Sequence, residues 1–498
     1  MLSLLAVLAF SALGSLALAP GIRAQPPGAS TTARVDARDE VIYEVYVRNF
    51  TREGTLVAAT RRLPEIKDLG ATTVWLMPIQ PIGEARRKGT LGSPYSIRDY
   101  TAVNPELGTD ADFQAFVDAA HGLGLKVIID LVANHTAWDH PWLTAHPDWY
   151  TRGADGLPQP PVADWTDVVD LNFDSPEMRA AMLAGMRYWV ERFGIDGYRC
   201  DVAELVPEDF WVDAIASLRT IKPVLMLAEG TTPGLPAAGF DLTYDWPLYG
   251  AMKRVWKEGR SVREITRALS DSATARMPAG HVRLRFTTNH DETAWDRPPM
   301  FAFNGTRGAQ AAFWTVALLP GAPLVYNGQE GGSTVNTPLF ERNPLPPFDP
   351  ETRDVYAAAL DARRLSDVLR EGTLVLHDAG DDVLLFERVL GRERVLVAVN
   401  TRNRPAALRP SAAIREAYNG TRRAPGVRPR SVLDIDGLTS DADAPVRLPN
   451  LTVPDDLTLG GYEVRTWGTV ALRASRLAAR DDSLTHLVVA LTRSGVAT

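Results

Sequence analysis

Three acidic residues stand at the ends of apolar runs that lie far apart in the chain. Asp201 closes the run GYRCD, Glu229 follows VLMLA, and Asp291 lies in FTTNHDE. A carboxyl group serves as a nucleophile when ionised and as a general acid when protonated, and the two together can cleave an acetal. If the three side chains meet, they predict hydrolysis of a glycosidic bond with retention at the anomeric carbon.

The neighbours of these acids indicate separate roles. Arg199 lies two residues before Asp201 on the same strand face, and its charge favours the ionised form that a nucleophile needs. Glu229 follows an apolar run that should desolvate it, which favours the protonated form and predicts the acid/base role. Asp291 would be the third carboxylate. Retention predicts that the Asp201 and Glu229 carboxyls lie about 5 to 5.5 Å apart, whereas roughly 9 Å would indicate inversion.

Each acid taken alone has a plainer interpretation, because a single Asp or Glu at a strand end more often caps a helix or lies on the surface. His135, which ends IIDLVANH, could likewise be a core histidine. The catalytic interpretation depends on coincidence, since four strand ends carry the residue types that one mechanism uses. Tyr95 in GSPYSIRDY follows the second apolar run, and an aromatic ring beside carboxylates is typical of a carbohydrate platform.

Metal binding is a further alternative. His135, His290 and the carboxylates could in principle bind zinc, but the chain has no HExxH or similar close pair. A structural calcium ion, with Asn134 and Asp170 as oxygen donors, is more compatible with the sequence. The chemistry itself is expected to need no cofactor.

The elements that must position these residues follow a regular order from Val41 to about Leu365. Short apolar runs alternate with amphipathic stretches such as Asp110 to Leu123, which predicts an α/β fold with a parallel sheet. Eight runs are predicted strands: Val41 to Val47, Thr73 to Met77, Lys126 to Leu131, Gly197 to Val202, Val224 to Ala228, Phe240 to Tyr244, Arg283 to Thr287 and Pro323 to Tyr326. Eight such units favour a (β/α)8 TIM barrel, with a doubly wound open sheet as the alternative.

Two regions depart from this alternation. Residues 136–174, after the third strand, form a long loop excursion rich in tryptophan (Trp138, Trp142, Trp149 and Trp165), whose rings could equally pack the loop or contact sugar. After Ser366, short period-2 runs separated by turn residues predict a C-terminal β-sandwich. The predicted organisation is a barrel over 39–370 and a sandwich over 371–473 with an exposed loop over 421–431, while the tail 474–498 has no assignment.

Composition limits the partners and the compartment. The formal net charge of -8 argues against binding to nucleic acid or an anionic membrane surface, and one cysteine, Cys200, excludes an intramolecular disulfide. Alternation along the strand should turn Cys200 away from the cleft, in a packing role. Residues 1–24, with an uncharged apolar stretch from Met1 to Ala19, are a predicted signal peptide, and 25–38 a linker; an uncleaved anchor is the alternative. We expect a secreted or periplasmic protein without a stable membrane partner after cleavage.

The motifs resemble the four signature segments of the α-amylase family of glycoside hydrolases, in order. These segments are DLVANH from Asp130, GYRCDVAEL from Gly197, LAEG from Leu227 and TTNHDE from Thr287; GAPLVYNGQE is similar to the family's eighth strand and VVDLN to its fifth segment. Many α-amylases have Lys-His where this chain has Glu204-Leu205, so the nucleophile motif is closer to the neopullulanase and cyclomaltodextrinase branch.

The resemblance implies a role for each matched residue and a class of substrate. Asp201 would be the nucleophile, Glu229 the acid/base and Asp291 the carboxylate that binds sugar hydroxyls, while Arg199 would orient Asp201. Tyr95 would stack on the glucose ring at the cleaved position, and His135 and His290 would donate hydrogen bonds to it. The implied substrates are α-1,4-glucans or maltooligosaccharides. Transglycosylation or isomerisation by the same residues, and a non-catalytic glycan-binding barrel, are the alternatives.

Overall fold

Eight parallel strands form a closed barrel in the computed structural model, which describes residues 35–270, 277–278, 281–419 and 453–468. The strands, in spatial order, are β1 (Ile42–Val45), β10 (Ala322–Tyr326), β9 (Val282–Arg285), β8 (Leu242–Tyr244), β7 (Leu225–Ala228), β6 (Gly197–Cys200), β3 (Lys126–Leu131) and β2 (Thr73–Leu76). Each predicted strand overlaps one of them, and β9 and β10 begin one residue earlier than predicted. The TIM barrel is therefore confirmed and the open sheet is wrong.

Helices surround the barrel and bury apolar residues against it, most often along one side of the helix. In α4 (Asp110–Gly122) the buried residues Phe113, Phe116, Val117 and Ala120 recur at helical spacing, and Thr109 and Asp112 form a capping box at the start. The other outer helices are α2 (Leu56–Arg61), α3 (Leu63–Leu69), α6 (Pro176–Phe193), α7 (Glu208–Arg219), α8 (Gly234–Ala238), α9 (Trp246–Glu258), α10 (Arg263–Ser270), α14 (Thr306–Leu318), α15 (Pro350–Arg364) and α16 (Asp367–Glu371). Shorter helices α1 (Val47–Phe50), α12 (His290–Trp295) and α13 (Pro299–Ala302) follow strands β1 and β9.

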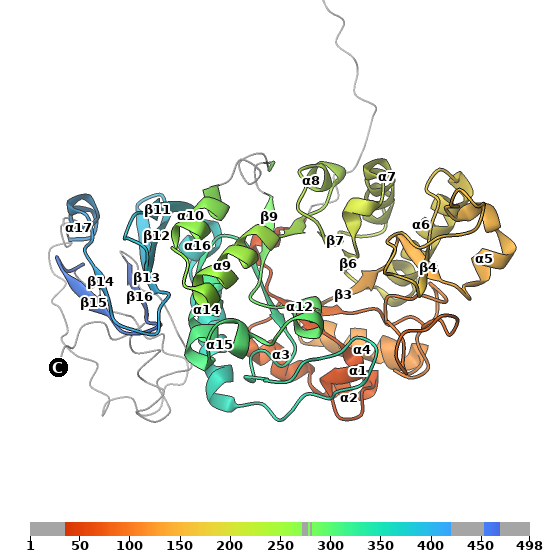
Figure 1. Cartoon of the computed structure of the whole chain (residues 1–498), viewed down its shortest axis with the longest axis horizontal. Coiled ribbons are helices and arrows are strands. Elements are labelled where there is room, and N and C mark those ends of the chain that lie inside the picture. The colour runs from red at the N-terminus through yellow and green to blue at the C-terminus, as the bar shows by residue number, and fades with distance from the viewer. Residues whose placement is uncertain (1–34, 271–276, 279–280, 420–452, 469–498) are drawn as a thin grey trace, which may run out of the picture.

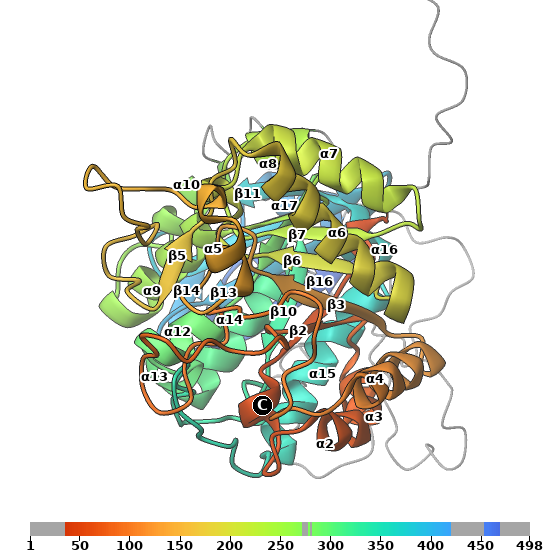
Figure 2. The same ribbon diagram turned by 90° about the vertical axis from the view of Figure 1, so that its right-hand side faces the viewer.

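The excursion after β3 is an ordered loop closed by a two-stranded ladder. Strand β4 (His135–Ala137) pairs antiparallel with β5 (Val168–Asp170), and His135 lies opposite Asp170. Helix α5 (Pro141–Ala145) lies between them. Figure 1 shows α5 at one end of the long axis and the C-terminal strands at the other, and Figure 2 looks onto the excursion. The ladder fixes His135 at the point where the excursion leaves the barrel.

The C-terminal region is built from antiparallel strands, as predicted. Its sheet has the order β11 (Thr373–His377), β12 (Val383–Leu390), β13 (Glu393–Asn400) and β16 (Val464–Gly468). One face, with Phe386 and Val397, packs on the barrel, and the other, with Leu385 and Leu396, packs on β14 (Ala406–Leu408), β15 (Leu457–Leu459) and α17 (Ala412–Asn419). Arg402 joins the two parts by donating to the carbonyls of Val255 and Arg260.

Several predicted segments lie outside the described residues: the signal peptide, most of the linker, the loop 421–431 and the tail 474–498. In the part of the chain that the structure does describe, no helix combines the length and apolar character needed to cross a bilayer.

Candidate active site

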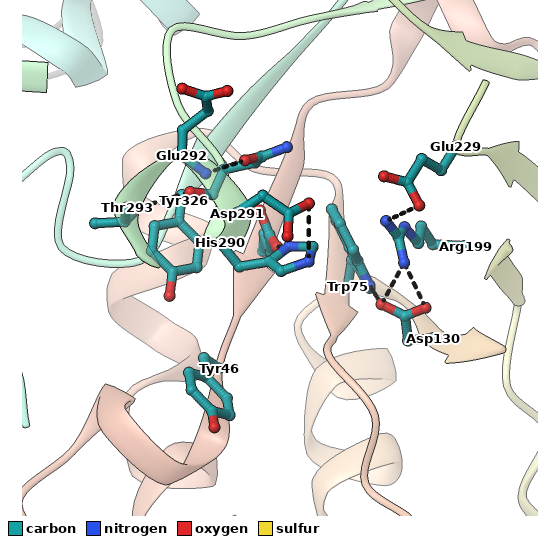
Figure 3. Close-up of polar contacts among 12 residues, drawn as sticks. Tyr46, Trp75, Asp130, Arg199, Glu229, His290, Asp291, Glu292, Thr293 and Tyr326 are labelled. Atoms are coloured by element: carbon teal, nitrogen blue, oxygen red, sulfur yellow. Dashed lines mark hydrogen bonds and ion pairs between the residues drawn. The ribbon is translucent and has the colours of Figure 1, made fainter. Parts of the chain in front are cut away.

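Two of the three predicted catalytic acids, together with Asp130, bind one arginine at the carboxyl ends of the barrel strands. Arg199 in β6 forms ion pairs with Asp201 (Nη1 to Oδ1, 2.8 Å), with Glu229 (Nη2 to Oε2, 2.8 Å) and with Asp130 (Nη1 to Oδ1, 2.9 Å). Figure 3 shows the guanidinium between Glu229 and Asp130. The predicted pairing of Arg199 with Asp201 is confirmed, and Arg199 also binds two acids for which the sequence gave no such partner.

Arg199 is fully buried and surrounded by aromatic rings. Its guanidinium carbon lies 5.1 Å from the Trp75 ring centroid, 5.8 Å from that of Tyr95 and 5.7 Å from that of Tyr244. Burial lowers the pKa of Arg199. The negative charges of Asp130 and Glu229 raise it by more than burial lowers it, so the pKa lies well above its usual value. The site therefore holds a permanent positive charge among its acids.

Asp201 follows the last residue of β6, and its backbone N–H donates to the Leu131 carbonyl at 2.9 Å. Burial raises the pKa of Asp201, while the charge and hydrogen bond of Arg199 and a hydrogen bond with Glu229 lower it. The net direction is upward. Arg199 thus lowers the pKa of Asp201, as expected. Desolvation raises that pKa by more, and it arises from burial in the folded barrel.

Glu229 follows β7 and is held by the turn after the neighbouring strand. The Val202 N–H donates to Glu229 Oε2 at 2.8 Å, and the Ala203 N–H donates to the Glu229 carbonyl at 3.1 Å. Val202 adopts a left-handed conformation (φ 38°), which is strained for a β-branched residue and directs its N–H toward Glu229. The apolar run before Glu229 is buried in β7, whereas the Glu229 side chain keeps 16% of its surface exposed.

Glu204 supports the same turn from the other side. Its carboxylate accepts hydrogen bonds from the backbone N–H groups of Thr231 and Thr232, the latter at 2.8 Å. Hydrogen bonds at Glu229 and after it thus join the turn that follows the predicted nucleophile to the turn that carries the predicted acid/base. Relative motion between Asp201 and Glu229 is restricted as a result.

Asp291 lies in the first turn of α12, on the opposite side of the site from Glu229 (Figure 3). Its Oδ2 is 3.4 Å from His290 Nε2, and its side chain remains 32% exposed. Burial and the nearby charge of Glu229 raise the pKa of Asp291, with Arg199 acting against them. Because one cation must balance several acids, a proton is retained more readily here than on an isolated aspartate.

His290 is oriented by two partners from distant segments. Nδ1 contacts Glu44 Oε1 in β1 at 2.5 Å, and Nε2 contacts the Tyr95 hydroxyl at 2.7 Å. The Tyr95 ring stacks on the imidazole with centroids 5.3 Å apart, and its hydroxyl donates to Asp130 at 3.2 Å. Tyr95 and His290 therefore form one wall of the site.

His135 lies beside this wall at the start of β4. Its side chain is buried, and the Trp165 ring meets it edge to face with centroids 5.6 Å apart. Burial lowers the pKa of His135 to about 4, against the charge of Asp167 and a hydrogen bond with the Tyr95 backbone. The imidazole is thus neutral near pH 7. The structure brings all seven predicted site residues together, while their roles toward a sugar stay predictions.

The loop tryptophans divide into two groups. Trp142 and Trp149 pack edge to face with centroids 5.2 Å apart, inside the excursion. Trp138 is covered by the Arg86 guanidinium, whose carbon lies 3.4 Å from the ring centroid. Packing explains these three rings, whereas Trp165 contacts the site residue His135.

The predicted calcium donors are adjacent but few. Asn134 Nδ2 and Asp170 Oδ1 lie 3.5 Å apart, and burial raises the pKa of Asp170. Calcium takes six to eight oxygen ligands. Among the described residues no cluster of three or more His, Cys, Asp or Glu side chains could hold a metal ion. Asn134 and Asp170 alone therefore do not complete a calcium site.

Sequence reasoning missed two residues of the site, Glu44 and Trp75, and gave no partner to Asp130. Glu44 and Trp75 lie inside strands, where they look like ordinary strand positions, yet Glu44 binds His290 and the Trp75 Nε1–H donates to Asp130 at 3.2 Å. A buried strand that contains a glutamate is the one signal that could have drawn attention to Glu44.

Comparisons with known proteins agree with this geometry. Residues 30–220 match the family model described as "Alpha amylase, catalytic domain". Alpha-amylase MalA of Haloarcula japonica is 29% identical over 457 residues, which cover 87% of this chain and 65% of that protein. The alpha-1,4-glucan:maltose-1-phosphate maltosyltransferase of Mycolicibacterium smegmatis is 31% identical over 70% of this chain and 54% of that protein. The chain thus spans less than two thirds of the length of these two relatives.

Two solved structures extend the likeness to the three-dimensional fold. An alpha-amylase from Lactobacillus plantarum has 30% sequence identity and a TM-score of 0.73, and the match covers 87% of this chain and 100% of that chain. A maltogenic alpha-amylase, AmyB, from Thermotoga neapolitana has 28% identity and a TM-score of 0.71, with coverage of 89% and 100%. Both solved chains are therefore matched over their whole length.

Proposed function

Because the chain belongs to the α-amylase family of glycoside hydrolases, we propose that it hydrolyses α-1,4-glucosidic bonds of starch-like glucans or maltooligosaccharides with retention. The observation that supports this most directly is the single guanidinium bound to both Asp201 and Glu229. Asp201 and Glu229 also share a side-chain hydrogen bond, and such contact leaves no room between them for the gap of about 6.5 to 9.5 Å that an inverting enzyme needs for its water.

In the first step, Asp201 attacks the anomeric carbon as Glu229 gives its proton to the glycosidic oxygen. The bond from carbon to that oxygen breaks, the leaving chain departs as an alcohol, and a glycosyl ester forms on Asp201. In the second step, Glu229 takes a proton from water, which attacks the same carbon and releases Asp201. Asp291 supplies negative charge beside the positively charged transition state, and Arg199 orients Asp201 and Glu229.

The test uses the variant Asp201→Asn with soluble starch and maltopentaose as substrates. We expect turnover to fall by about 10⁴-fold, as for other covalent catalysts that lose the nucleophile. Asp209→Asn, an exposed acid paired with Arg179, is the matched control and should leave turnover unchanged. NMR of the newly released reducing end should show the α-anomer first. An initial β-anomer, or a fully active Asp201→Asn variant, contradicts the proposal.

Transfer of the glycosyl unit to a sugar hydroxyl in place of water is the second candidate. It is supported by the similarity to maltosyltransferases, of which one is 37% identical over 43% of this chain. The same catalytic residues serve either acceptor. Chromatography of the products from maltotetraose distinguishes the two, because transfer yields oligomers longer than the substrate.

The third interpretation, a non-catalytic glycan-binding barrel, is disfavoured by the convergence of all three carboxylates and by family membership. We further propose that the protein is secreted or periplasmic through the predicted signal peptide, and that the chemistry needs no cofactor. Fractionation of producing cells tests the location, and activity in a chelator tests the cofactor. An α-glucan is the proposed partner, and we expect neither nucleic acid nor a stable membrane partner.

A further inference from the structure

Trp295 is the most exposed large apolar side chain of the described residues. It ends α12 with 65% of its surface accessible, four residues after Asp291. Four residues of helix advance about 6 Å and return to the same face, so Trp295 lies roughly one turn beyond the predicted catalytic carboxylate. An indole exposed at the rim of a site is available to a ligand.

A second aromatic ring, that of Phe340, contacts the Trp295 ring. Phe340, in the segment between β10 and α15, meets the Trp295 ring edge to face with centroids 5.6 Å apart. The pair presents a joined apolar surface larger than a scattered surface residue provides. Its two rings come from chain segments that flank the site after strands β9 and β10.

Phe340 is also bonded to the loop that carries Tyr95. The Leu91 N–H donates to the Phe340 carbonyl at 3.0 Å, and the Thr90 N–H donates to Glu341 Oε1 at 2.8 Å. Lys88 lies 6.0 Å from the Phe340 ring centroid and pairs with Asp167 of the excursion at 3.1 Å. The two aromatic rings thus belong to the same rim as the wall of the site.

The pair lies on a defined side of the cleaved bond. Figure 3 places Asp291 and His290 on one side of Trp75, and Glu229 with Arg199 on the other. Glu229 protonates the leaving oxygen, so the leaving chain lies toward Glu229. A chain that continues past Asp291 toward Trp295 is therefore the glycone part, on the non-reducing side.

We propose that Trp295 and Phe340 form an aromatic platform that binds a glucose unit of the glycone chain, beyond the unit held by Tyr95. Sugar rings present apolar C–H faces that lie flat on aromatic rings. The platform makes this a site for chains rather than for single glucosyl groups. This inference rests on the proposed hydrolysis of α-glucans.

The experiment compares wild type with Trp295→Ala, Trp295→Phe and Phe301→Ala. Phe301 is also an exposed aromatic residue, 44% accessible on the nearby helix α13, and serves as the control. Initial rates are measured on maltopentaose and on 4-nitrophenyl α-glucoside, whose only sugar is the glucose at the cleaved position and which has no further glycone unit. Thermal unfolding of each variant checks the fold.

We expect Trp295→Ala to raise KM for maltopentaose roughly 3- to 10-fold, the range for one lost aromatic contact, with 4-nitrophenyl α-glucoside turnover unchanged. Trp295→Phe should recover most of the loss, and the products of Trp295→Ala should shift toward glucose. Unchanged KM, or an equal loss on both substrates, overturns the platform. If the wild type itself fails to cleave maltopentaose, the proposed function is what fails.

Discussion

Replacing Arg199 by methionine tests whether one buried cation stabilises the site by charge or by packing. Methionine fills most of the space of the arginine stem without its charge. The change removes three ion pairs of 2.8 to 2.9 Å from one fully buried guanidinium. Breaking a buried pair from one side costs about 3 to 5 kcal/mol, and three pairs that share one cation do not add, so we expect about that range in total.

The charge explanation predicts that this cost depends on pH. In the unfolded chain the carboxyls titrate near pH 4. In the folded wild type, burial already raises the pKa values of Asp130 and Asp201, and loss of the cation raises them further. Above pH 4 the folded variant therefore binds more protons than its unfolded chain, and its stability falls as pH rises. The cost relative to wild type should grow from pH 5 to pH 8.

The assay is urea unfolding of wild type and Arg199→Met at several pH values from 5 to 8. Arg219→Met, which removes a 3.0 Å pair with Asp241 away from the site, is the control for activity and should leave kcat unchanged. Arg199→Lys keeps the positive charge but lacks the planar guanidinium. Its stability should therefore lie between that of wild type and that of Arg199→Met. A cost that is equal at pH 5 and pH 8 refutes the reasoning, because lost packing does not titrate.

Three further results are expected. Asp291→Asn should become more stable than wild type as pH rises above about 4, because burial and Glu229 raise the pKa of Asp291. Urea unfolding midpoints of both proteins across pH measure this. A difference in stability that does not change with pH contradicts it. Glu204→Ala should lower kcat by up to about 10²-fold with KM unchanged, and it should shift the pH profile of activity. The reason is that the backbone N–H groups of the turn after Glu229 lose the carboxylate that accepts their hydrogen bonds. An effect on KM alone contradicts this prediction. EDTA should leave kcat unchanged well below Tm, whereas a higher Tm with added calcium would indicate that the folded protein binds a structural calcium ion.

The barrel and most of the site could be predicted because both follow from local pattern. Each strand is a short apolar run, and side chains at the carboxyl ends of parallel strands must meet at one rim of a barrel. That rule alone brings Asp201 and Glu229 together. The eight strand positions needed no knowledge of long-range contacts.

What could not be predicted depends on tertiary contacts. Glu44 and His290 are 246 positions apart, and their contact becomes visible only when β1 and α12 are placed in space. The rise in the pKa of Asp201 arises from burial, which sequence spacing does not measure. Trp295 could have been noticed by its helical spacing from Asp291, but its exposure depends on the neighbouring loops.

The imbalance of charge in the site links stability to catalysis. Arg199 acts on four acids, Asp130, Asp201, Glu229 and Asp291, so the site favours protons and positive charge. A glycosyl transition state carries positive charge at the same place and meets carboxylates that are already oriented. The property that makes ionised Asp291 costly to the folded protein is therefore the property that stabilises the reacting sugar. Asp291→Asn must therefore gain stability and lose turnover together. A variant that is more stable but keeps its turnover would show that the two effects have different causes.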